Sequence, residues 1–140
     1  MLKKSFLLIS LSVFLMLLAA CGGGATNAPV DEPVPVGDAA NGETMFSQPT
    51  IGANNAPGCI TCHSLEPDVV IVGPSQAGLA TRAESRVPGQ SAEDYIRNSI
   101  THPNDYVVEG FAEGVMYQNY ATDLTADEID DLVAYTLTLK

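Results

Sequence analysis

Positive charge is scarce in this chain. Its 140 residues include six Lys and Arg against 17 Asp and Glu. Residues 1–20 hold two of the lysines and no acid, so without them the chain has 4 basic and 17 acidic side chains and a formal charge of −13. Nucleic acid and anionic lipid surfaces are therefore poor partners, and a basic docking surface on another protein is favoured. Solubility is an equally good reason for the acidity, so charge alone identifies no partner.

Long hydrophobic runs are also lacking. The longest, residues 6–20, is uncharged and mostly apolar but has 15 residues, fewer than the roughly 20 that span a bilayer core. Because Lys3 and Lys4 precede it, the run is typical of a secretory signal peptide. It ends in Leu18-Ala19-Ala20-Cys21, which resembles the lipobox of bacterial lipoproteins. We therefore expect lipidation at Cys21 and a lipid anchor on the extracytoplasmic (periplasmic) face of the cell membrane.

These features divide the chain into three segments. Residues 1–20 are predicted to be the lipoprotein signal peptide, residues 21–37 the lipidated N-terminus with a linker, and residues 38–140 one domain. Between residues 22 and 37, seven of sixteen residues are Gly or Pro and no hydrophobic period is present, which is typical of a linker. A linker of this length spans roughly 20–25 Å, so the domain would stay close to the membrane.

Residues 38–140 lack a convincing strand pattern and contain three clear helix signals. The first helix begins at the N-cap candidate Asp38. The second begins at Ser91, in a capping-box pattern, and is stopped by Pro103. The third begins at the capping box that starts with Thr125. We predict an all-α domain of short helices, in which one face of the last helix is buried in the core. That face consists of Ile129, Leu132, Val133, Thr136 and Leu137.

Cysteine and histidine are scarce, with three and two residues, and this limits the chemistry of the motif Cys59-Ile60-Thr61-Cys62-His63. A structural zinc ion takes four ligands, but the chain adds only His102, and adjacent Cys62 and His63 are awkward ligands for one ion. A thioredoxin-like redox dithiol needs a βαβ framework that the helical pattern does not supply. Both alternatives are weaker than the covalent attachment of haem.

Haem attachment accounts for every residue of the motif. Two thiols three residues apart on one turn can add to the two vinyl groups of a haem, and the next residue then lies under the iron as an imidazole ligand. We therefore predict one covalent haem c, held by Cys59 and Cys62 and ligated by His63. The attachment takes place outside the cytoplasm, where the signal sequence directs the chain.

The ligand on the other face of the iron decides between electron transfer and ligand chemistry. After signal removal the remaining methionines are Met45 and Met116. Met45 lies in a predicted helix before the motif and is expected to fill the core. Met116 lies in an irregular, glycine-containing segment that is long enough to cross a haem face. We predict that His63 and Met116 ligate the iron, with His102 or an open position as the alternatives.

These landmarks resemble those of class I cytochromes c over essentially all of residues 38–140. The resemblance implies the class I cytochrome c fold, with short helices wrapped around one covalently bound haem c. It also implies that the first and last helices cross at Gly42 with Phe46 and Tyr135. The matching segments are Gly42-Glu43-Thr44-Met45-Phe46, the haem motif, Val72-Gly73-Pro74, Met116 and LTADEIDDLVAYTLTL at residues 124–139.

The resemblance assigns a further role to Pro74, which is counted among the cofactor-binding residues. Its carbonyl is expected to accept a hydrogen bond from His63, fixing the ring's tautomer and tuning its strength as a ligand. Without the resemblance, Pro74 would equally be a loop proline that starts a helix at Ser75. The chain departs from many class I cytochromes c after Met116, where Tyr117 takes the place of a proline.

The resemblance implies an electron carrier and not an enzyme by itself. The expected function is one-electron transfer by a membrane-tethered monohaem cytochrome c in a respiratory or photosynthetic chain. Residues 101–135 are similar to haem domains of respiratory complexes, among them the monohaem cytochrome c subunit of alternative complex III. The expected partners are membrane redox complexes: a quinol-oxidising complex, a terminal oxidase or a reaction centre. The alternatives are a haem enzyme or gas-binding sensor with an exchangeable distal site, and a haem-free adhesive lipoprotein.

Overall fold

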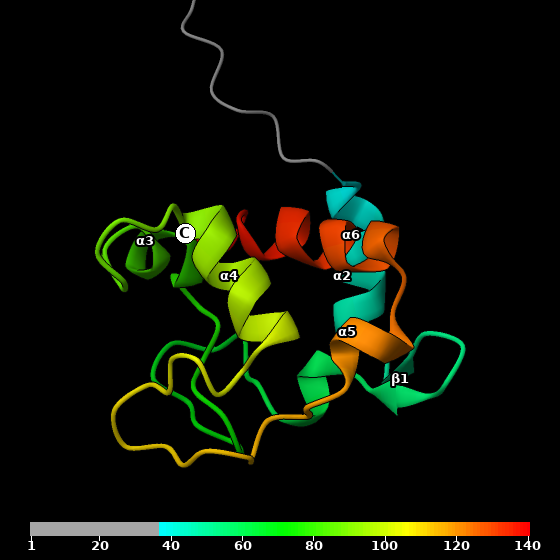
Figure 1. Ribbon diagram of the computed structural model, residues 1–140, viewed down its shortest axis with the longest axis horizontal. Helices are drawn as coiled ribbons and strands as arrows, with labels where there is room; N and C mark the ends of the chain where they lie inside the picture. Colours follow the sequence, from blue (N-terminus) through cyan, green and yellow to red (C-terminus); the bar gives the residue numbers. More distant parts are fainter. Residues whose placement is uncertain (1–36) are drawn as a thin grey trace, which may run out of the picture. The chain divides into compact units, whose positions relative to one another are not determined.

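Five α-helices with irregular connections make up residues 37–140, the part of the chain that the computed structural model of the protein describes (Figure 1). The predicted all-α class is confirmed. Within these residues no helix is both long and apolar enough to cross a membrane. The signal peptide, Cys21 and all but the last residue of the linker lie outside the described part. In order, the elements are α2 (Ala39–Ser47), β1 (Thr50–Ile51), β2 (Ala56–Pro57), the 3-10 turn η1 (Cys59–Thr61), α3 (Leu79–Ala83), α4 (Ala92–Thr101), α5 (Tyr120–Asp123) and α6 (Ala126–Thr136).

α2 and α6 cross at close range and form the centre of the core (Figure 1). A Cβ on Gly42 would lie 1.9 Å from the backbone oxygen of Asp131, so only glycine permits this approach. Beside it, the rings of Phe46 and Tyr135 pack edge to face, with centroids 5.4 Å apart. Asp131 also ties the helices together, because its Oδ1 accepts a 2.6 Å hydrogen bond from the backbone N–H of Asp38. The crossing implied by the resemblance is confirmed.

The helix starts follow the predicted capping chemistry. Asp38 caps α2, with its Oδ1 accepting a 2.9 Å bond from the Ala40 N–H. At α6 the box is complete: the Thr125 N–H donates to Glu128 Oε2 at 2.8 Å, and the Glu128 N–H donates to Thr125 Oγ1 at 3.3 Å. The predicted core face of α6 is buried, except that Leu137 caps the helix and is half-buried. Satisfied N–H groups at these ends stabilise helices too short to persist alone.

The start of α4 is a variant of the expected capping box. The Ser91 hydroxyl accepts a 3.1 Å bond from the Asp94 N–H, and it donates to the Asp94 carboxylate at 2.7 Å. The shorter Asp side chain thus bonds the hydroxyl, whereas the Glu of α6 also reaches the N-cap backbone. α4 ends at Thr101, two residues before Pro103, as expected. Its buried side chains, Tyr95 and Ile96, face the core.

A two-residue antiparallel ladder joins β1 to β2, although the sequence pattern predicted no strand here. The register pairs Thr50 with Pro57 and Ile51 with Ala56. Two residues are too few to produce an alternating pattern, so the sequence carries no signal for this pairing. The ladder leads directly into Gly58, whose N–H donates a 2.9 Å bond to the Pro49 carbonyl. The ladder therefore fixes where the haem motif begins.

Candidate functional site

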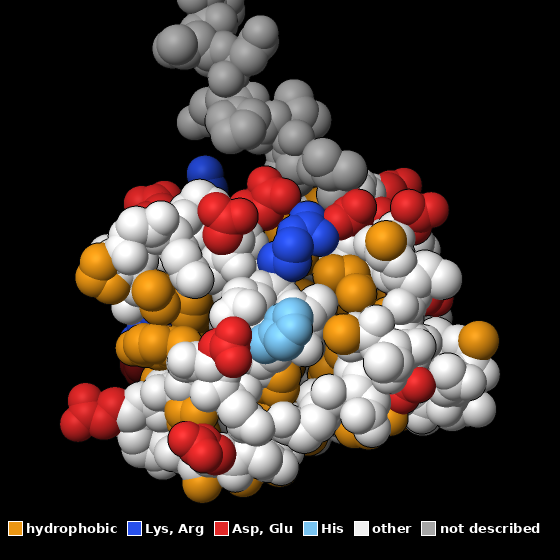
Figure 2. Space-filling view, viewed as in Figure 1, with side chains coloured by type: hydrophobic (Ala, Val, Ile, Leu, Met, Phe, Trp, Pro, Cys, Tyr) orange, Lys and Arg blue, Asp and Glu red, His pale blue; other side chains and the backbone are white. Residues whose placement is uncertain are grey.

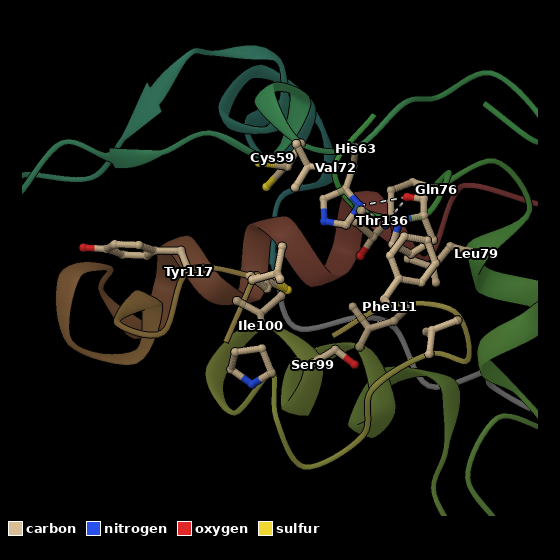
Figure 3. A pocket seen from close by; sticks show the side chains of 18 of the residues that line it. Cys59, His63, Val72, Gln76, Leu79, Ser99, Ile100, Phe111, Tyr117 and Thr136 are labelled. Atoms are coloured by element: carbon tan, nitrogen blue, oxygen red, sulfur yellow. Dashed lines mark hydrogen bonds between the residues drawn. The ribbon is translucent and has the colours of Figure 1, made fainter. Parts of the chain in front are cut away.

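A cavity of about 330 Å³ lies between α4, α6 and the loops that follow η1 and α4. In the close-up, Cys59, Val72 and His63 lie on one side of it, and Ile100 and Ser99 of α4 lie on the other (Figure 3). The volume is in the range of small-molecule sites, which are typically concave and apolar with a few polar groups. In the space-filling view, hydrophobic side chains show in crevices between the surface atoms and at a few places on the rim, whereas the acidic side chains lie on the outer surface (Figure 2). The cavity is therefore suited to a flat apolar group with a few anchoring contacts.

The haem motif forms one tight turn at the wall of this cavity. The N–H groups of Cys62 and His63 both donate to the Cys59 carbonyl, at 3.1 and 2.9 Å. Both cysteines are half-buried and line the cavity. Burial raises the pKa of the Cys59 thiol to about 11. Redox-active dithiols instead have lowered thiol pKa values, so this site does not have the properties of a thioredoxin-like pair.

His63 is held in one orientation. Its Nδ1 lies 2.8 Å from the Pro74 carbonyl oxygen, so the expected hydrogen bond is present. The ring packs flat against Gly73, where a Cβ would lie 2.4 Å from His63 Cε1. Burial lowers the pKa of His63, with the Pro74 carbonyl acting in the opposite direction, and neutral imidazole is the form that ligates metals. The other interpretation of Pro74 is wrong, because the next helix begins at Leu79 and not at Ser75.

Met116 lines the same cavity from the loop between α4 and α5. The next residue, Tyr117, donates from its hydroxyl to the Asp123 carboxylate at 2.5 Å, and this bond raises the pKa of Tyr117. Tyr120 donates from its hydroxyl to the Pro57 carbonyl at 2.6 Å, just before the haem motif. The rings of Tyr117 and Tyr120 pack edge to face with centroids 5.0 Å apart, so two neighbouring phenol groups attach the chain just after Met116.

The rival ligand positions are placed elsewhere. His102 is exposed, its Nδ1 lies 2.9 Å from Thr101 Oγ1, and it is not among the residues that line the cavity. Met45 is buried in the helical core, as predicted for a core filler. Cys59, Cys62, His63, Pro74 and Met116 all line the one cavity. Cys21, the remaining predicted site residue, lies outside the described residues.

Among the polar residues of the cavity that were not predicted, three bear on the haem site. Arg82 and Arg86 line it, and Arg82 Nη2 donates a 2.8 Å bond to the Ser75 carbonyl. Neither arginine belongs to a motif, so the sequence carried no signal for their place in the cavity. Gln76 is the third, with its Nε2 only 2.8 Å from His63 Nδ1. Nothing in the local sequence marks this glutamine, since its position depends on how the loop folds back.

Paired thiols and an oriented, neutral imidazole on one wall of an apolar cavity define a protein that carries a covalent haem. The family model described as Cytochrome c matches residues 39–140. The chain therefore belongs to the cytochrome c family, which binds covalent haem c and serves haem-based electron transfer. The predicted class I fold and cofactor are confirmed. No curated protein gives a significant match to the chain.

Proposed function

We propose that this protein is a monohaem one-electron carrier whose iron is ligated by His63 and Met116 and whose haem is bonded to Cys59 and Cys62. The observation that carries the proposal is the 2.8 Å contact between His63 Nδ1 and the Pro74 carbonyl. This contact leaves Nε2 of the ring free to ligate a metal. The haem supplies a one-electron ferric/ferrous couple.

The residues around the cavity support a closed site. His63 is half-buried and its ring is oriented by the Pro74 carbonyl, and the loop that carries Met116 is attached at the next residue, Tyr117, to Asp123. Thioether sulfur opposite imidazole raises a haem potential and closes the iron to oxygen. Arg82 and Arg86 line the cavity; Arg82 donates to the carbonyls of Ser75 and Ala77, and a guanidinium such as that of Arg86 could bind a haem carboxylate.

Carbon monoxide binding separates this function from a gas sensor or haem enzyme. A sensor needs an exchangeable distal site, and an enzyme usually adds an acid–base residue there. We expect the reduced protein at neutral pH to bind carbon monoxide slowly and weakly. Rapid binding would favour the enzyme or sensor. A protein without a pyridine haemochrome spectrum would support a haem-free role instead.

We further propose that the protein is tethered by lipid at Cys21 to the extracytoplasmic face of the membrane, where it exchanges electrons with membrane complexes. The signal and lipobox pattern supports the tether. The acidic surface supports partners with basic docking sites, such as a quinol-oxidising complex, a terminal oxidase or a reaction centre. A place as the monohaem subunit of alternative complex III is the most specific form of this proposal.

Replacing the lipidation site tests the tether. Cys21→Ser removes the acylated thiol, so we expect the haem protein to appear in the soluble fraction with an unchanged spectrum. Wild-type protein washed in high salt should stay on the membrane. If the variant also stays bound after the salt wash, the lipid is not the anchor.

Native separation after mild detergent extraction, followed by haem staining, distinguishes a shuttle from a subunit. A shuttle migrates at the size of the single chain. A subunit migrates with a large complex, and its association should resist an increase in salt that disrupts purely electrostatic docking.

A further inference from the structure

We propose that Gln76 is a second hydrogen-bond acceptor for the Nδ1 proton of His63, and that it thereby lowers the reduction potential of the haem. This role rests on the proposed function, because it requires His63 to ligate iron through Nε2. Gln76 is then a positioning residue that acts on the iron through the imidazole.

Three polar groups meet at one point beside the cavity. His63 Nδ1 lies 2.8 Å from the Pro74 oxygen and 2.8 Å from the outer amide atom of Gln76, assigned as Nε2. That amide atom is also 3.3 Å from the Pro74 oxygen. Dashed lines in Figure 3 mark hydrogen bonds at the His63 ring, and the side chain of Gln76 lies beside the ring. Pro74 is therefore not the only partner of the imidazole.

The backbone fixes Gln76 in this place. Its N–H donates a 2.8 Å bond to the Ser64 carbonyl, and its carbonyl accepts a 3.0 Å bond from the Leu79 N–H. Ser64 directly follows His63, so the loop folds back onto the residue next to the ligand. The side chain is half-buried, and its amide is directed at the ring. Because the backbone holds Gln76 here, its amide stays next to the His63 ring.

Ligation through Nε2 decides which amide atom faces the ring. A neutral imidazole carries one proton, so with Nε2 bound to metal the proton must be on Nδ1. An amide NH₂ at 2.8 Å would then place a donor against a donor. The oxygen and nitrogen of an amide are assigned from their hydrogen bonds and exchange places by a simple turn. With Oε1 toward the ring, the Nδ1 proton is shared between two oxygens in a three-centre bond. This removes the donor–donor contact at 2.8 Å and gives up the longer 3.3 Å bond from the amide to the Pro74 oxygen.

Two acceptors give the imidazole more anionic character than one does. Hydrogen bonds to the outer nitrogen raise the basicity of a ligating histidine, and such bonds are one of the means by which a protein sets a haem potential. A more basic ligand stabilises the ferric state more than the ferrous state. Gln76 is therefore expected to counteract part of the rise in potential that Met116 causes.

Nuclear Overhauser spectra of the ¹⁵N-labelled ferrous holoprotein test the amide orientation directly, since a six-coordinate low-spin ferrous haem is diamagnetic. With Oε1 toward the ring, the cross-peak between the His63 Nδ1 proton and the Gln76 amide protons should be weak. An intense cross-peak would place the NH₂ group against the ring and overturn the proposal. This measurement needs no variant.

Gln76→Leu tests the effect on potential, with Gln48→Leu as the matched control at an exposed glutamine outside the cavity. Loss of one acceptor should shift the ferric/ferrous equilibrium toward the ferrous state by up to about tenfold, equivalent to a rise of 59 mV for a one-electron couple. The control should not shift it. An unchanged or lower potential in Gln76→Leu would overturn the proposal.

The haem spectra distinguish failure of the role proposed for Gln76 from failure of the proposed function. Wild-type protein without a six-coordinate low-spin haem spectrum would refute the ligand pair itself. A normal spectrum with an unshifted potential in Gln76→Leu would refute only the role of Gln76. If Gln76→Leu does not fold, the cross-peak measurement on the wild type still decides.

Discussion

Residues 63–76, on the His63 side of the cavity, are attached to the haem motif by backbone hydrogen bonds, whereas residues 103–119, which include Met116, are attached by side chains. On the first side, the N–H groups of Val72 and Gly73 both donate to the Cys62 carbonyl, at 3.1 and 2.9 Å. Backbone groups are present whatever the side chain, so these bonds survive most substitutions.

On the Met116 side, the backbone bonds are local, such as the 3.1 Å bond from Phe111 N–H to the Val108 carbonyl. The longer connections pass through Asn104, which accepts from the Gly114 N–H at 2.9 Å and donates to Gln118 Oε1 at 2.7 Å. Such bonds vanish with a single substitution. The comparison teaches that the His63 side tolerates the loss of side-chain hydrogen bonds but not added volume next to the imidazole, whereas the Met116 side is where removing one side-chain group can change the stability of the site.

The largest loss of haem content and stability is expected from a substitution that fills the space beside the His63 imidazole. Gly73→Ala places a Cβ 2.4 Å from His63 Cε1, which costs roughly 1–3 kcal/mol by overpacking and displaces the ring. We expect most of the haem-loaded protein to be lost, as measured by haem absorbance per mole of protein and by thermal unfolding.

Gly110→Ala is the matched control on the Met116 side. Gly110 has a φ of +90°, but nothing lies within 4 Å of its Cβ position. The left-handed backbone costs roughly 1–2 kcal/mol, so this variant should lose stability while keeping a normal haem content. Equal haem content in both variants would show that the ring is not confined by Gly73.

Met116→Ala should have the next largest effect. Covalent attachment through the cysteines remains, so the protein should stay red, but the near-infrared sulfur-to-iron band of the ferric form should vanish. The potential should fall, with a shift of more than about tenfold in the ferric/ferrous equilibrium, or 59 mV. Met45→Leu, in the core, should retain both properties. A band that survives in Met116→Ala would move the ligand elsewhere.

The smallest effect is expected from Tyr117→Phe, which removes only the hydroxyl bonded to Asp123. The loop should then release Met116 more easily, so added imidazole should bind the ferric haem roughly two- to tenfold more tightly. Tyr106→Phe removes a hydroxyl from another tyrosine of the cavity and should bind imidazole like the wild type. If the two variants behave alike, the bond to Asp123 does not restrain the loop.

The sequence predicts best those features that depend on near neighbours along the chain. Thr125 and Glu128 form the capping box within the first turn of α6. The haem-attachment motif, Cys59, Cys62 and His63, likewise lies on and directly after the single turn η1. Met116 is predicted as a ligand because Met45 is its only methionine competitor after signal removal, and the structure places Met116 among the cavity-lining residues. The resemblance supplied Pro74, eleven residues from the ring that it contacts.

The features that escaped prediction depend on tertiary placement. The β1–β2 ladder is too short for a pattern, and the contact of Gln76 with His63 arises because the intervening loop turns back on Ser64. The Tyr117 bond to Asp123 joins the ligand loop to α5, a helix of four residues that no periodicity marks. In each case the tertiary structure determines which residues are in contact, and the spacing of residues along the sequence does not.

The crossing of α2 and α6 has a consequence for the order of assembly. It joins the two ends of the domain, with Asp38 bonded to Asp131 across 93 residues, so it cannot form until almost the whole domain is available to fold. A chain that emerges N-terminus first presents its two thiols before α6 exists to contribute Leu132 and Thr136 to the cavity wall. Haem attachment can therefore precede closure of the cavity, and in that order the last helix would complete the wall around a haem that is already bonded.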